Sequence, residues 1–428
     1  MTLSKLAGGP FPQPDKVCLD MTKALTQIKT FPLPMQYMGS KQRIARWVLD
    51  EIDEAFAGTR TLVDLMSGSG TIANEAASRG WGIWANDIQP YSHRVLSAAF
   101  QSSRDELPAI VGWFEDGNLS RMLLDGSRQS LSEALLVEES FVEAHDDGVF
   151  GWKGYADFCA SVNGRHHEAT GEFDLFSNYY PNTYFGVRQC LEIDAIREMA
   201  AKLGEDGSNL VIAALISSMT FVASTTTHLA QYLKPSSEST ALNLIAKRSK
   251  SVEAEVLARL RGLMSYARPA RATTLNMGFE DALAAIESDQ NSTVVYADPP
   301  YFKEHYSRYY HVLDTVALYD YPNLTYNDRI QQVTVGRYRE DRIVSAFGLR
   351  SKAPSAFREL FRLTREKGYQ LALSYANTSL LSAETIITLA EDEGFRVDMK
   401  SIDLRHSGQG QTGRNSIVTE YLFLMSHD

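Results

Sequence analysis

The sequence predicts an α/β protein with a mostly parallel, Rossmann-like sheet whose last strand is antiparallel, and with a large helical insertion. Apolar, β-branched stretches alternate with amphipathic runs near both ends of the chain, which is typical of βαβ units. That alternation disappears between residues 101 and 271. The last two apolar stretches flank a loop short enough for a hairpin. We therefore expect three parts: 1–100, 101–271 and 272–428.

Composition places the chain among ordinary globular proteins. Its 428 residues carry a net charge of −11, and the three cysteines, Cys18, Cys159 and Cys190, form no Cys-x-x-Cys pair. We therefore expect no disulfide framework and no metal site. The N-terminus lacks the pattern of a signal peptide, and the longest apolar stretch, 210–223, is too short and too rich in serine to span a bilayer. These features predict a soluble, cytoplasmic protein without a membrane partner.

A glycine-rich turn organises the first part. Residues 1–34 contain five prolines and predict an irregular arm with one short helix, and a loop at 36–43 leads into a helix over 44–56. A strand at 61–65 is followed by Met66-Ser67-Gly68-Ser69-Gly70-Thr71, a helix over 72–79 and a strand at 82–85 that ends near Asp87. This order is typical of a nucleotide-binding βαβ unit in which the acid binds ribose hydroxyls. Asp87 as a turn or capping residue is the alternative, and the missing third glycine argues against NAD.

The middle part is predicted to be helical and unevenly charged. Helical patterns cover 190–202, 210–233 and 252–266. Residues 104–174 hold fifteen acidic side chains against five basic ones, whereas 243–271 hold seven basic against two acidic. The basic end, together with an aromatic cluster in the same part, suits nucleic acid, although such clusters more often belong to a core.

The most informative stretch is Val294-Val295-Tyr296-Ala297-Asp298-Pro299-Pro300-Tyr301, a buried strand ended by two prolines. The prolines make a stiff turn that presents Asp298, the Pro299 carbonyl and the Tyr301 ring together. Two acceptors on the N–H bonds of a planar amine would free its delocalised lone pair, and Tyr301 would stack on the attached ring. A Pro-Pro turn with a capping Asp is the plainer reading of the same residues.

The remaining elements complete the sheet. We expect a strand at 272–277 followed by a helix, a strand at 369–375, a helix at 383–393, and strands at 395–402 and 416–425 that form the terminal hairpin around a loop at 406–414.

Taken together, these motifs resemble the N6-adenine-specific DNA methyltransferases of the DNA adenine methylase type, in which the cofactor half precedes the catalytic half (the alpha-type motif order). Tyr37-Met38-Gly39-Ser40-Lys41 looks like the N-terminal cofactor motif of that family. Residues 64–71 look like its glycine loop, although Met66 stands where the family usually has Phe, and 298–301 look like its catalytic tetrapeptide. The family places a target-recognition domain where this chain has its helical insertion.

The resemblance implies S-adenosyl-L-methionine as cofactor and duplex DNA as substrate. Ser67, Gly68 and Gly70 would line the methionine end, Tyr37 and Lys41 its carboxylate, Asp87 the ribose, and Phe279 with Glu280 or Asp281 the adenine ring. The motif residues Gly39, Asp64 and Thr71 complete the implied cofactor site. Asp298, Pro299, Pro300 and Tyr301 would bind a flipped adenine, whose N6 attacks the methyl group by direct displacement.

The DNA contacts are expected from loop arginines and from the basic end of the insertion. The candidates are Arg268, Arg271, Arg308, Arg337, Arg339 and Arg414. Each alone is more often a surface arginine than a base reader.

Several alternatives stay open. No Pro-Cys occurs, which excludes methylation at cytosine carbon 5, whereas N4-cytosine chemistry would use the same corner. An RNA adenine methyltransferase, a catalytically silent DNA-binding specificity subunit and, less favoured, a protein-glutamine methyltransferase are the other readings. The sequence leaves open a companion restriction nuclease or defence system, and the oligomeric state.

Overall fold

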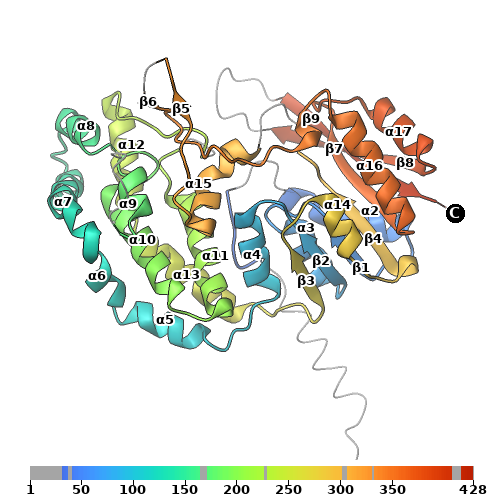
Figure 1. The fold of residues 1–428 in the computed structure, drawn as a ribbon, viewed down its shortest axis with the longest axis horizontal. Coiled ribbons are helices and arrows are strands. Elements are labelled where there is room, and N and C mark those ends of the chain that lie inside the picture. Colours follow the sequence, from blue (N-terminus) through green and yellow to red (C-terminus); the bar gives the residue numbers. More distant parts are fainter. Residues whose placement is uncertain are drawn as a thin grey trace, which may run out of the picture.

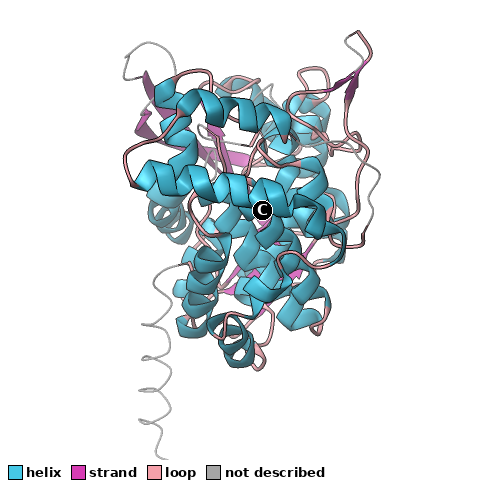
Figure 2. Ribbon diagram, turned by 90° about the vertical axis from the view of Figure 1, so that its left-hand side faces the viewer, coloured by secondary structure: helices cyan, strands magenta, loops and turns pink. Residues whose placement is uncertain are grey.

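The computed structural model describes residues 31–36, 41–163, 171–225, 229–300, 306–329, 332–406 and 416–427. Most of the predicted N-terminal arm lies outside these ranges. Figure 1 shows a sheet with its covering helices beside a lobe built from helices, and Figure 2 shows that helical lobe from its own side.

One of the two lobes contains a seven-stranded sheet with the strand order β3-β2-β1-β4-β7-β9-β8. Its strands are β1 (Thr61–Asp64), β2 (Gly82–Asn86), β3 (Ala272–Leu275), β4 (Thr293–Ala297), β7 (Gln370–Ala376), β8 (Arg396–His406) and β9 (Ser416–Ser426). The first five run parallel, and β9 pairs antiparallel with both β7 and β8. The predicted fold class, including the terminal hairpin, is confirmed.

Alternating side chains of the strands pack into two hydrophobic cores, one on each face of the sheet. Leu62 and Val294 belong to the core shared with α2 (Ala45–Ala55), α3 (Thr71–Ser78) and α4 (Pro90–Phe100). Val63 and Val295 point the other way, into the core shared with α14 (Phe279–Ala285), α16 (Ala353–Glu366) and α17 (Ala383–Asp392). Because both faces are covered, all five residues of β4 are buried.

The second lobe is helical, as expected. Its helices are α5 (Leu107–Glu115), α6 (Asn118–Met122), α7 (Ser132–Asp146), α8 (Trp152–Ser161), α9 (Leu175–Tyr179), α10 (Val187–Ala201), α11 (Glu205–Val222), α12 (Glu238–Arg248), α13 (Val252–Ser265) and α15 (Tyr306–Leu318). Helices α10, α11, α13 and α15 share one hydrophobic core with α4. This core therefore contains residues from both sides of the predicted boundary at residue 100. A smaller core lies between α7, α8, α10 and α12.

The structure differs from the sequence prediction in several elements, which include helices such as α4 and α12 that were not predicted. The helix expected over 210–233 ends at Val222, because Ala223 leaves the helical conformation and Ser224 N–H donates to the Tyr184 carbonyl. Helix α16 and a small hairpin of β5 (Tyr326–Asn327) and β6 (Gln332–Val333) were not predicted. Four short 3-10 turns, η1 (Lys41–Arg43), η2 (Gly126–Leu131), η3 (Gln290–Ser292) and η4 (Ala346–Gly348), complete the elements of the described ranges.

Candidate functional site

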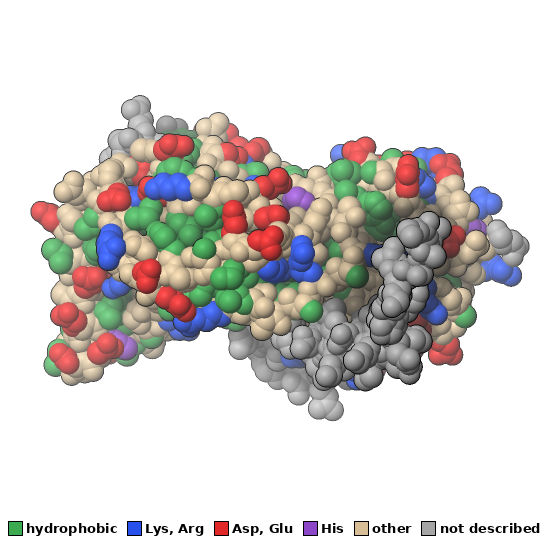
Figure 3. Space-filling view, turned by 90° about the horizontal axis from the view of Figure 1, so that it is seen from below, with side chains coloured by type: hydrophobic (Ala, Val, Ile, Leu, Met, Phe, Trp, Pro, Cys, Tyr) green, Lys and Arg blue, Asp and Glu red, His purple; other side chains and the backbone are tan. Residues whose placement is uncertain are grey.

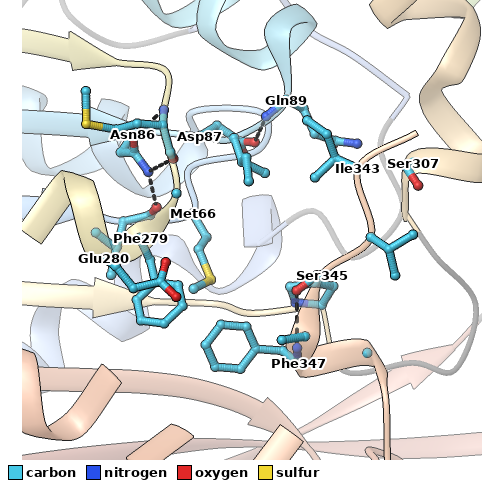
Figure 4. A pocket seen from close by; sticks show the side chains of 18 of the residues that line it. Met66, Asn86, Asp87, Gln89, Phe279, Glu280, Ser307, Ile343, Ser345 and Phe347 are labelled. Carbon is cyan, nitrogen blue, oxygen red and sulfur yellow. Dashed lines mark hydrogen bonds between the residues drawn. The ribbon is translucent and has the colours of Figure 1, made fainter. Parts of the chain in front are cut away.

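The carboxyl ends of the parallel strands surround a cavity of about 310 Å³ (Figure 4). Leu65 follows β1, Asp87 follows β2 and Asp298 follows β4, and all three line it. The order of strands reverses between β1 and β4, and such a reversal point is where open α/β sheets bind ligands. The other lining residues are Met66, Asn86, Ile88, Gln89, Met277, Gly278, Phe279, Glu280, Pro300, Ser307, Ile343, Val344, Ser345, Ala346, Phe347 and Gly348.

The glycine-rich turn closes one side of this region. Gly68 and Gly70 have φ values of 52° and 74°, in the left-handed region that favours glycine. A Cβ on Gly70 would also meet Leu96 Cδ2 at 2.9 Å. Ser67 N–H donates to the Asn86 carbonyl, and its hydroxyl donates to the Asp64 carbonyl at 2.8 Å. The turn starts α3 at Thr71; Met66 lines the cavity, whereas Gly68 and Gly70 do not.

Asp87 joins the end of β2 to the glycine turn. Gly68 N–H donates to Asp87 Oδ2 at 2.7 Å, and Gln89 N–H donates to Asp87 Oδ1 at 2.8 Å. Burial raises the pKa of this carboxyl, and the two backbone hydrogen bonds oppose that rise. Each carboxylate oxygen can accept further hydrogen bonds. The position is compatible with both readings of the sequence, a turn-stabilising acid and a ribose ligand.

Aromatic and thioether side chains form an apolar wall of the cavity. The rings of Phe279 and Phe347 lie 5.3 Å apart, and Met66 points toward the same corner (Figure 4). Glu280 lines the cavity beside them, whereas Asp281 is exposed and is not among the lining residues. Of the two acids that the sequence left undecided, Glu280 is therefore the one that faces the cavity.

Asp64 lies deeper, in a second cavity of about 20 Å³ that Lys41, Ser67, Ser69, Thr71 and Asp298 also line. Ala73 N–H donates to Asp64 Oδ2 at 3.2 Å, while the buried Oδ1 accepts no hydrogen bond from any described residue. Burial, together with the nearby Asp298 and Asp87, raises the pKa of Asp64 to about 8. An oxygen left open in this way is suited to a cationic ligand group.

Asp298 is joined by a buried lysine and a buried glutamate. Lys41 Nζ lies 3.1 Å from Asp298 Oδ1 and 2.6 Å from Glu420 Oε1. Burial raises the pKa of Asp298 to about 6, Lys41 opposes that rise and Glu420 adds to it. Lys41, which the sequence assigned to the cofactor carboxylate, therefore contacts two protein carboxylates. The sequence reasoning missed Glu420, although an acid inside the apolar strand at 416–425 was a signal.

The sequence reasoning also missed the mouth of the cavity. Ile88, Ile343 and Val344 line it and are 43%, 37% and 49% exposed. The Ser307 hydroxyl is buried there and has no hydrogen-bond partner among the described residues. Figure 4 shows Ile343 and Ser307 on the side opposite Phe279.

The candidate DNA-binding arginines lie in different places. Arg268 donates to the carbonyls of Gln101 and Ser102, beyond the end of α4, and Arg271 precedes β3. Both lie at the amino edge of the parallel strands, opposite the cavity, because α4 runs back from the carboxyl end of β2. Figure 3 shows basic and acidic side chains interspersed over one face of the molecule.

The other three described arginines contact the protein itself. Arg337 donates to the Tyr179 carbonyl at 2.6 Å, and Arg339 pairs with Asp320 at 2.7 Å and with Asp341 at 2.9 Å. Arg308 donates to the Tyr338 hydroxyl at 3.0 Å and follows Ser307 of the cavity wall. Of the described candidates, Arg308 is thus the one that directly follows a residue of the cavity wall.

Four predicted site residues, Tyr37, Gly39, Tyr301 and Arg414, lie outside the described residues. Pro300 lines the cavity, and Pro299 is buried beside it. Within the described ranges, no three His, Cys, Asp or Glu side chains are arranged to hold a metal ion. Every helix in those ranges is too short or too polar to cross a membrane.

Known proteins similar to this chain are named as methyltransferases or modification methylases. A family model described as D12 class N6 adenine-specific DNA methyltransferase matches residues 37–346. Modification methylase LlaI of Lactococcus lactis subsp. lactis is 24% identical over 370 residues, which are 83% of this chain and 48% of that protein. Type II methyltransferase M.FokI of Planomicrobium okeanokoites is 23% identical over 413 residues, or 92% of this chain and 53% of that protein.

A third relative is more nearly this chain's size. Type II methyltransferase M.CviAII of Paramecium bursaria Chlorella virus 1 is 23% identical over 397 residues, which are 91% of this chain and 97% of that protein. The chain thus spans about half the length of the first two relatives and nearly all of the third.

Proposed function

The chain belongs to the D12 class of N6 adenine-specific DNA methyltransferases, and from this premise we propose that it methylates the N6 amino group of adenine in duplex DNA as a modification methylase. The observation that carries the proposal is the position of Asp298 and Pro300 in the wall of the same cavity that the end of β2 and Phe279 also line. One cavity would then hold the methyl donor and the acceptor amine side by side, which is the arrangement that direct transfer needs.

S-adenosyl-L-methionine is the proposed cofactor, and the residues present fit it. Phe279, Phe347 and Met66 offer an apolar wall for the adenine ring, with Glu280 at its edge. Asp87 offers carboxylate oxygens to the ribose hydroxyls. The open Oδ1 of Asp64 suits the ammonium of the methionine end, near Ser67 and Thr71. When bound, this cofactor supplies an electrophilic methyl group on a sulfonium.

The chain's own residues would prepare the acceptor. We assign the carboxylate of Asp298 and the carbonyl of Pro299 to the two N–H bonds of the adenine amine, with Tyr301 stacked on the base. Accepting both N–H bonds shifts electron density onto the nitrogen, and Asp298 must be ionised to do so. The apolar side chains at the mouth would exclude water from the reacting atoms.

The base has to leave the duplex to reach this cavity, at a cost of about a few kcal/mol. We propose that residues 101–271 form the target-recognition part and that Arg308 contacts the DNA next to the site. A companion restriction nuclease is proposed as a partner, because the relatives are named modification methylases and type II methyltransferases.

Transfer of labelled methyl from S-adenosyl-L-methionine to unmodified genomic duplex DNA, with RNA in parallel, tests the proposal. Nucleoside analysis of the DNA should give N6-methyladenine. Label in N4-methylcytosine would indicate that the enzyme methylates cytosine, and label in RNA would indicate that RNA is the substrate. Cofactor binding without transfer to any nucleic acid would favour the silent specificity subunit.

A further inference from the structure

Glu420 is a buried carboxylate in the last strand that the proposed reaction does not use. It lies on β9, opposite Ala376 of β7, and is 3% exposed. Lys41 Nζ donates to its Oε1 at 2.6 Å, and the Ser374 hydroxyl donates to the same oxygen at 3.3 Å. A buried carboxylate is costly unless it is paired, so its place beside the site needs a reason.

Lys41 is shared unequally between two carboxylates. Its Nζ is 0.5 Å closer to Glu420 Oε1 than to Asp298 Oδ1, from the distances of 2.6 Å and 3.1 Å. Asp298 Oδ1 is buried and accepts no hydrogen bond of good geometry from the described residues. The ammonium therefore pairs more closely with Glu420 than with Asp298.

The other groups that face Asp298 do not neutralise it. Asp64 lines the same small cavity as a further acid, and Tyr296 supplies a hydroxyl whose pKa burial holds well above its usual value. Lys41 is thus the one cation among the residues that line this cavity. Burial opposes its charge, but Asp298 and Glu420 hold its pKa above the ordinary value.

Resting on the proposed function, we propose that Glu420 is a positioning residue: it holds the Lys41 ammonium away from full pairing with Asp298, so that Lys41 still favours the ionised form of Asp298 while the carboxylate stays available to the adenine amine. Without Lys41, burial would drive Asp298 to bind a proton. Without Glu420, the ammonium would pair fully with Asp298 and make that carboxylate a poorer acceptor for the amine.

Lys41 and Glu420 shift the pKa of Asp298 in opposite directions, so the direction of the shift in each variant tests the proposal. The pKa of Asp298 is about 6, lowered by Lys41 and raised by Glu420. Glu420→Gln should therefore lower it, and Lys41→Met should raise it, each by roughly one unit. If Glu420 and Lys41 only supported the fold, the substitutions Glu420→Gln and Lys41→Met would not shift the pKa of Asp298 in opposite directions.

The direct measurement is a carbon-13 titration of the full chain labelled at aspartate carboxyls, with Asp298→Asn identifying the signal. Glu420→Asp, which keeps the charge, should stay close to the wild type. Glu391→Gln, an exposed residue of α17, is the matched control. An unchanged Asp298 titration in Glu420→Gln would overturn the proposal, and so would equal titrations in Glu420→Gln and Lys41→Met.

The same variants are then compared in single-turnover methyl transfer to genomic duplex DNA across pH. In Glu420→Gln, the acid limb of the rate profile should move to lower pH, and the plateau rate should fall about tenfold because the paired Asp298 is a poorer acceptor. The dissociation constant of S-adenosyl-L-methionine should change by less than about threefold. A plateau rate equal to that of the wild type would overturn the positioning role.

Two further outcomes are informative. If the wild type methylates no nucleic acid, the proposed function fails, while the carboxyl titration still decides whether Glu420 and Lys41 set the charge of Asp298. If Glu420→Gln does not fold, Lys41→Met and Ser374→Ala take its place. Ser374→Ala removes the hydrogen bond that steadies Glu420 and should lower the plateau rate in the same direction, and no change in either variant would overturn the proposal.

Discussion

Charge is buried in two regions of this molecule, and the two regions treat it differently. In the helical lobe, Arg248 is 2% exposed and donates to the Tyr155 hydroxyl, to Asn182 Oδ1 and to the Thr183 carbonyl. Both oxygens of the buried Glu138 accept backbone N–H bonds at the start of α10, at 2.9 Å and 2.8 Å. At the strand ends, by contrast, Asp64 keeps a buried oxygen without a hydrogen bond from the described residues, and Asp298 shares the Lys41 ammonium with Glu420.

This difference in hydrogen-bond partners distinguishes buried charges that stabilise the fold from buried charges that are suited to bind a ligand. A buried ion whose partners all come from the protein is satisfied before anything binds, and removing it leaves other groups unpaired. A buried oxygen without a partner weakens the free protein and gains most when a ligand supplies the missing donor. Substitutions in the two regions should therefore affect different quantities.

The largest effect is expected for Asp298→Ala, which should lower methyl transfer by several orders of magnitude while the affinity for S-adenosyl-L-methionine stays near that of the wild type. The carboxylate is assigned to the target amine and not to the cofactor, so the loss belongs to the rate. Asp146→Ala, at a side chain that is 72% exposed on α7, is the control. An equal loss of cofactor affinity would remove this assignment of Asp298.

The next effect concerns stability in the helical lobe. Arg248→Met should lower the free energy of unfolding by about 3 to 5 kcal/mol, because Asn182, Tyr155 and Glu138 would lose their buried cation. Denaturant titration measures the change. The folded fraction should still bind cofactor with normal affinity. A variant of wild-type stability would show that this cluster is not what holds the lobe together.

Asp64 should make stability depend on pH. Its pKa is raised to about 8 in the folded protein, so the folded form keeps a proton that the unfolded chain releases at lower pH. This contribution is fully present below the ordinary pKa of an aspartate and is lost as the pH rises through 8. Relative to Asp64→Asn, the ligand-free wild type should therefore lose about 2 to 4 kcal/mol between pH 5 and pH 8.

Denaturation of both proteins at the two pH values measures this difference, and parallel curves would contradict it. Asp64→Asn should at the same time bind S-adenosyl-L-methionine more weakly at pH 8, since the amide cannot pair with an ammonium. If Asp64→Asn is less stable than the wild type at pH 8, the charge of Asp64 stabilises the fold, as that of Arg248 does.

The smallest effect is expected at the amino edge of the sheet. Arg271→Ala should change DNA affinity by less than about twofold, because this edge lies opposite the cavity, whereas Arg308→Ala should weaken binding and reduce its dependence on salt. Binding to duplex DNA at two salt concentrations distinguishes them. An effect of Arg271 equal to that of Arg308 would require DNA to contact both edges.

Local signals in the sequence were enough to predict most of the sheet. The buried strand before Asp298, the glycine turn at Gly68 and Gly70 and the terminal hairpin depend on neighbouring residues, and the structure has them within a few positions of the prediction. The overlong helix that ends at Val222 shows the limit. Its continuation looked helical, but the backbone N–H of Ser224 bonds to Tyr184, far away in sequence.

Contacts between distant segments decided what the sequence could not. Arg339 looked like a loop arginine, and its pairing with Asp320 became visible only when the chain between them was placed. Lys41 and Glu420 are separated by 379 positions, and no pattern in either segment indicates the other. Predicting that pair requires the sheet order, in which β9 lies beside β7.

The place of β9 between β7 and β8 also sets an order of assembly. Strand β8 reaches the sheet only through β9, so the terminal hairpin has to dock as a unit. A nascent chain halted on the ribosome before residue 416 would carry Lys41 and Asp298 without the second carboxylate between which the ammonium is held. The charge arrangement around the β4 corner is therefore complete only after β9 has been synthesised and has docked.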